Sequence, residues 1–142
     1  MTLNFPPRSG YETVGSIVMF GRTLDKIRLH NAGMLPKDYN LGHGLDGRIC
    51  RFLGVDYQFL VAETLKGKSD EEILNKCFQL GQKPSDEEIF VFNQFMMKRG
   101  WRDDISQWLL EQKQKHGFAN HNEIQTAFDF HDADEGRKLK FF

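Results

Sequence analysis

The chain has few cysteines, no long apolar run and almost no net charge, and each of these scarcities excludes a class of protein. Cys50 and Cys77 are too few to staple a domain of 142 residues, so we expect reduced thiols in a cytoplasmic protein. No window approaches the roughly 18 apolar residues of a membrane span. The first ten residues lack the basic start and apolar run of a signal peptide. The sequence therefore predicts neither a membrane span nor a targeting segment.

The net charge of −1 argues against a non-specific binder of nucleic acid or of membranes. The motifs of common catalytic and metal sites are also missing. There is no His-Glu-x-x-His, no Cys-x-x-Cys, no P-loop and no nucleophile elbow. We therefore expect no cofactor, no metal and no nucleic-acid partner.

Two segments match a known motif only in part. Gly42, Gly44 and Gly47 spell G-x-G-x-x-G, but a loop precedes them where the dinucleotide motif requires a strand. We interpret these glycines as a flexible loop before a helix, whose free N–H groups could still hold an anion. The acidic segment 129–136 lacks the ligand order of an EF-hand loop. We expect a solvated acidic surface there, with loose cation contact at its aspartates as the alternative.

Phenylalanine is abundant, with 13 residues, and predicts an aromatic-rich core. Apolar residues recur at helical spacing between turn residues, and no segment alternates with period two for long enough to predict a strand. We expect an all-α fold: a compact single domain over residues 1–142, with six or seven short helices around a buried first helix. The expected helices run from a cap at Ser9 to about Asn31 and over residues 45–53, 57–66, 70–80, 86–99, 103–116 and 122–130.

Helix starts are marked in the sequence by capping residues. The segment SDEE occurs twice, and in each copy a serine, Ser69 or Ser85, precedes a glutamate by three residues, which is the pattern of a capping box. Asp56 can cap the expected helix over residues 57–66, which precedes these two segments. The helix that follows Ser85 is expected to bury its apolar residues, namely Ile89, Phe92, Phe95 and Met96.

Charged residues lie on the first expected helix, beside an apolar stripe that should be buried. An unpaired buried charge costs several kcal/mol, so these charges need partners. They lie three or four residues apart and therefore on one side of the helix. One alternative is an internal network of ion pairs that fixes the loop 33–44 against the helix. The other is an anion site in which arginines grip a carboxylate or phosphate. The candidate site residues are Arg22, Asp25, Lys26 and Arg28 on the helix, with Tyr39, His43 and Asp46 from the loop and the helix after it.

Several short segments, taken in order, resemble a known family. They are Pro7–Ser9, Gly15, the R-x-x-DK-x-R pattern of Arg22–Arg28, Gly33, Tyr39, Leu45-Asp46, FLGVD at Phe52–Asp56 and the SDEE-I-L segment. Together they resemble domain-of-unknown-function family 5069, an uncharacterised bacterial group. The resemblance spans about residues 6–105, with a helical extension over about 117–142. It implies a small bacterial protein and brings no established activity, substrate or catalytic residue.

Two hypotheses for function follow. The first is a non-enzymatic helical module that binds a protein partner or a small anionic ligand, because the chain carries no catalytic signature. The second is an enzyme acting on a small anionic metabolite, with a pocket between the first helix and the segment 33–46. Its acid–base groups would be Tyr39, His43 or Asp46 beside the arginines. The oligomeric state is left open.

Overall fold

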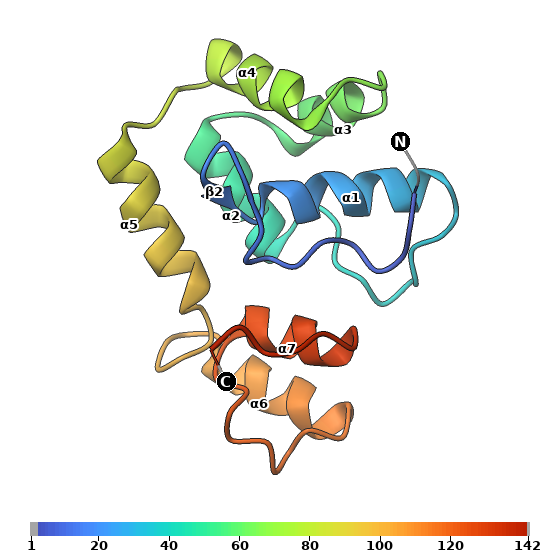
Figure 1. Ribbon diagram of the computed structural model, residues 1–142, viewed down its shortest axis with the longest axis vertical. Helices are drawn as coiled ribbons and strands as arrows, with labels where there is room; N and C mark the ends of the chain where they lie inside the picture. The colour runs from blue at the N-terminus through green and yellow to red at the C-terminus, as the bar shows by residue number, and fades with distance from the viewer. Residues whose placement is uncertain (1–2, 142) are drawn as a thin grey trace. The chain divides into compact units, whose positions relative to one another are not determined.

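A computed structural model describes residues 3–141 and shows seven helices with one very small sheet (Figure 1). The mostly helical fold expected from the sequence is confirmed. The elements are β1 (Thr13–Val14), β2 (Ile17–Val18), α1 (Phe20–Asn31), α2 (Gly44–Leu53), α3 (Tyr57–Thr64), α4 (Asp70–Leu80), α5 (Asp86–Met97), α6 (Ser106–Lys115) and α7 (Ala127–Asp134). Within the described residues, no helix is long and apolar enough to cross a membrane.

Backbone contacts divide the chain into two compact units, Met1–Asn93 and Gln94–Phe142. In the first unit α1 is the central element: Phe20 and Leu24 are fully buried, and α1 packs against α3 and β1 (Figure 1). The buried first helix is thus confirmed. In the second unit α6 packs against α7 around Leu109, Ile124 and Phe130. The single domain expected for residues 1–142 stays a prediction.

The first helix begins later than predicted, at Phe20, and a hairpin precedes it. Val14 pairs with Ile17 across a two-residue turn in which Gly15 and Ser16 have φ of 55° and 68°. Two positive φ values are what the favoured hairpin turn requires. The Asn93 side chain holds this turn from the end of the unit, accepting from the Val18 N–H at 3.1 Å and donating to the Ser16 carbonyl at 2.7 Å. The prediction of a helix from Ser9 was wrong, because strands of two residues leave no alternating pattern to detect.

The two predicted capping boxes are confirmed. The Ser69 hydroxyl accepts from the Glu72 N–H at 3.2 Å, and the Glu72 carboxylate accepts from the Ser69 N–H at 3.1 Å. Ser85 and Glu88 exchange the same two bonds at the start of α5. Asp56 stands at the N-cap of α3, but its side chain makes no capping bond there.

Two expectations for the second unit were wrong. α7 begins at Ala127, capped by Thr126, and the acidic segment is partly buried rather than solvated. Asp129 is 4% exposed, and its carboxylate accepts from the Gln125 N–H at the helix start. Asp132 is 3% exposed and pairs with Arg137. Among residues 3–141 no three acidic, histidine or cysteine side chains gather closely enough to hold a metal ion.

Helix α6 also begins later than predicted, at Ser106. The Asp103 carboxylate accepts from the Gly100 and Ile105 N–H groups, each at 3.0 Å, and so organises a turn before the helix. Asp103 therefore acts as a turn residue, because its side chain offers the backbone an alternative to the first helical turn.

Candidate functional site

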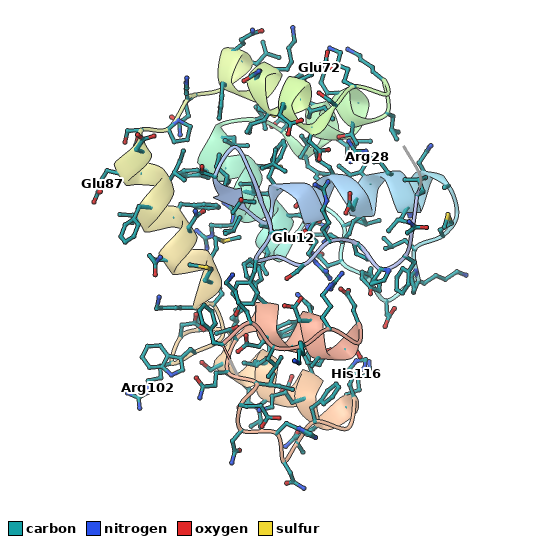
Figure 2. The ribbon with its side chains drawn as sticks, in the orientation of Figure 1. Glu12, Arg28, Glu72, Glu87, Arg102 and His116 are labelled. Atoms are coloured by element: carbon teal, nitrogen blue, oxygen red, sulfur yellow. The ribbon has the colours of Figure 1, made fainter. Side chains whose placement is uncertain are left out.

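Two of the predicted site residues of α1 belong to a ring of four alternating charges that we call the arginine–aspartate ring: Arg8, Asp25, Arg28 and Asp70. Arg8 grips Asp25 with two side-chain nitrogens, each at 2.9 Å. It reaches Asp70 with its third nitrogen at 2.8 Å. Arg28 extends from α1 toward the start of α4, lying 2.9 Å from Asp70 and 3.5 Å from Asp25 (Figure 2). Two guanidinium groups thus meet two carboxylates, and the formal charge of the ring is zero.

The ring joins three separate parts of the chain. The N-terminal segment contributes Arg8, α1 contributes two members and α4 contributes the fourth. Gly21 makes room for Arg8, since a Cβ there would lie 2.9 Å from the Arg8 Cζ. The Arg8 backbone N–H also donates to Asp25 at 2.9 Å. Bidentate arginine–carboxylate pairs of this kind fix geometry as well as charge, so the ring positions the N-terminal segment against α1.

The charges of the ring shift the pKa of two members. Burial acts to raise the pKa of Asp70, but hydrogen bonds from Arg8 and Arg28 outweigh it and hold that pKa below its usual value. The hydrogen bond with Asp25 raises the pKa of Arg8 above its ordinary value. Both shifts favour the charged forms, so the ring is an ion-pair network over the neutral pH range.

A second cluster, the Lys26–Asp46 pair, is buried more deeply. The Lys26 Nζ lies 2.9 Å from an Asp46 carboxylate oxygen, with side chains 5% and 0% exposed. Asp46 also accepts from the Thr23 hydroxyl at 2.8 Å and from the Gly42 N–H at 3.0 Å. Lys26 donates to the Asn40 carbonyl at 2.9 Å. The pair therefore fastens the loop before α2 to α1 through its backbone.

The remaining predicted residues differ in their placement. Arg22 is 2% exposed and donates to the Arg8 carbonyl at 3.1 Å. Its guanidinium carbon lies 6.0 Å from the centre of the Tyr39 ring, and that ring meets Phe5 edge-on. His43, in contrast, is exposed at the start of α2. The structure thus brings Arg22 and Tyr39 together.

Sequence reasoning missed two members of the ring. Arg8 lies in the Pro7–Ser9 segment that carries the family resemblance, and Asp70 lies in the first SDEE segment, which the sequence marks only as a helix start. The signal that could have found them was the positive excess on α1, because buried cations need carboxylates from elsewhere in the chain. Asp38, a carboxylate in the loop between α1 and α2, is exposed.

A hollow on the surface at α4 is lined by residues that belong to neither cluster. It is lined by Lys68, Glu72, Asn75, Lys76 and Gln79. None of these is a predicted site residue. Glu72 is already engaged in the cap of α4.

The two buried thiols are poorly suited to act as nucleophiles. Burial raises the pKa of Cys50 to about 12 and that of Cys77 to about 11. A thiolate is the nucleophilic form of cysteine, so these shifts oppose any nucleophilic role at neutral pH.

Comparison with known families gives one match. The family described as "Domain of unknown function (DUF5069)" matches residues 4–137, which extends the resemblance seen in the sequence beyond residue 105 and through α7. No curated protein matches the chain.

Proposed function

The chain belongs to the DUF5069 family, and we propose that it is a non-enzymatic module that binds a protein partner through one face of α5. The observation that carries the proposal is the exposure of large apolar side chains on that helix. Phe90 is 59% exposed, Val91 is 56% exposed and Phe95 is 43% exposed. Phe95 was expected in the core, and its exposure corrects that prediction. Apolar groups clustered on a surface mark interaction sites more often than scattered ones do.

The exposed residues share one side of the helix. At 100° per residue, positions 87, 90, 91, 94, 95 and 98 fall on the side opposite Phe92 and Met96, which are 7% and 0% exposed. We call this side the outward face of α5; it consists of Glu87, Phe90, Val91, Gln94, Phe95 and Lys98. Glu87 points away from the helix in Figure 2. Aromatic groups within a polar rim are typical of the centre of a protein–protein interface.

The alternative, a small-anion or enzyme site on α1, receives less support from the geometry. Asp25 and Arg28 pair within the ring, and Lys26 pairs with Asp46. An anion arriving there would have to displace carboxylates that already meet the cations at about 2.9 Å. The remaining candidate residues of that alternative site are Arg22, Tyr39 and His43.

Site-specific photo-cross-linking in cells tests the proposal. A photoreactive amino acid is placed at Val91 on the outward face, at Asn75 on the exposed side of α4 as a matched control, and at His43 for the alternative site. We expect discrete protein adducts from position 91 and only background from position 75. Adducts from position 43 but not from position 91 would contradict the proposal, as would equal yields at all three positions.

A further inference from the structure

We infer that the partner for the outward face of α5 is a second copy of this chain, bound antiparallel across a two-fold axis. This inference rests on the proposed function and names its partner. The reason is that two copies of the face, running in opposite chain directions, place acidic residues of one copy level with basic residues of the other.

The self-complementarity can be read from the residue numbers. When the axis passes through the midpoint between residues 92 and 93, each residue of one copy lies level with the residue of the second copy at equal distance on the other side of that midpoint. Glu87 is then level with Lys98 of the second copy, Phe90 with Phe95, and Val91 with Gln94. Acid therefore meets base at the ends of the face, and the two aromatic residues lie at matching levels on its two sides. An isologous interface requires this kind of match between a surface and its own copy.

Helix geometry brings these residues to the contact. Positions 87, 91, 94 and 98 are spaced by four, three and four residues, which forms a single stripe along a helix. In an antiparallel pair, Glu87 of one copy lies level with Lys98 of the second copy at each end of the stripe. Val91 lies level with Gln94 of the second copy at its centre. Because Phe90 and Phe95 flank the stripe, their rings cover its two sides and shield the centre from water.

Charge and helix dipoles favour the antiparallel arrangement over the parallel one. A parallel pair would place Glu87 beside its own copy and Lys98 beside its own copy, so like charges would meet at both ends. The antiparallel pair places opposite charges there, and it sets the N-terminal end of each dipole against the C-terminal end of the other. Lys98 follows the last residue of α5 and donates to Gln94 at 2.9 Å, so it stays close to the stripe.

A single pair of helices of 12 residues each forms a small interface. Interfaces below about 1,200 Å² of total buried area are typical of weak and transient complexes. We therefore expect a dimer that dissociates in the micromolar range or above.

Charge reversal tests the inference without changing the apolar groups. Glu87→Lys and Lys98→Glu are prepared singly, and each is studied alone and mixed with the other by sedimentation equilibrium from about 10 µM to about 1 mM, a range suited to a weak interface. Each variant alone should dimerise at least about tenfold more weakly than the native chain, because like charges meet at both ends. The equimolar mixture should recover native affinity, because the basic side chains of the first variant face the acidic side chains of the second at both ends of the stripe. Glu71→Lys and Lys115→Glu, at exposed positions off the face, should leave the dimer unchanged.

The recovery in the mixture cannot arise from poorly folded variants, since unfolding of either one would weaken the mixture further. A native chain that stays monomeric at about 1 mM, or a dimer insensitive to both reversals, would overturn the inference. If position 91 still cross-links to a different protein in cells, the proposed function stands while the inference fails. A monomeric chain with no adduct at position 91 would overturn both.

Discussion

The substitution Lys26→Met tests whether the buried charges of α1 are structural. Methionine keeps the length and apolar stem of lysine but removes the ammonium group, so it leaves Asp46 with only neutral donors from Thr23 and Gly42. Both side chains of the pair are almost completely buried. Removing one partner of a buried ion pair costs about 3 to 5 kcal/mol, because the other charge stays in the interior. We expect about 3 kcal/mol, the lower end, because the two remaining donors still stabilise the carboxylate.

The assay is urea unfolding followed by far-ultraviolet circular dichroism, with the slope against urea compared between variants. The double variant Lys26→Met with Asp46→Asn should be more stable than Lys26→Met alone, because the uncompensated charge is gone. Lys37→Met, in the exposed loop, is the matched control and should change stability by less than about 0.5 kcal/mol. A cost below about 1 kcal/mol for Lys26→Met, or a double variant weaker than the single one, would refute the reasoning.

Three further predictions concern other positions in the chain. The lowered pKa of Asp70 means that its stabilising effect is present above about pH 4 and is lost as the pH falls through its folded value. The stability difference between the native chain and Asp70→Asn should therefore shrink on acidification, and a constant difference in unfolding titrations would contradict this. Cys50 and Cys77 should resist a thiol reagent at pH 8 until urea unfolds the chain; rapid labelling of the folded chain would show that they are accessible. Gly81→Ala should lower the melting temperature, because its Cβ would clash with the Leu53 carbonyl oxygen, and an unchanged melting temperature would exclude that clash.

The starts of α4 and α5 were predictable because each carries local chemistry that acts over three residues. The capping boxes at Ser69 and Ser85 fixed the starts of α4 and α5 from the sequence alone. The hairpin before α1 was not predictable in this way. Its two strands are too short to show alternation, and the Asn93 side chain that holds its turn lies 77 residues from Ser16. Helices α6 and α7 begin later than predicted because aspartate side chains bind backbone groups just before each helix.

The charged cluster shows a sharper limit of sequence reasoning. Spacing along α1 identified Asp25, Lys26 and Arg28 as charges that need partners. It could not name Arg8 and Asp70, because ion pairs between distant segments leave no periodic signal. The exposure of Phe95 was missed because helical spacing shows which residues share a face of a helix, but not whether that face meets the core.

A dilution series followed by two-dimensional NMR tests the central proposal most directly, because it reports on α1 and α5 in the same sample. We expect the signals of Phe90, Val91 and Gln94 to move with concentration from about 1 mM to about 10 µM, the range of a weak interface. Signals of Lys26 and Arg28 should stay in place, both on dilution and on addition of phosphate. Concentration-dependent shifts at α1, or phosphate-dependent shifts there with none at α5, would contradict the account.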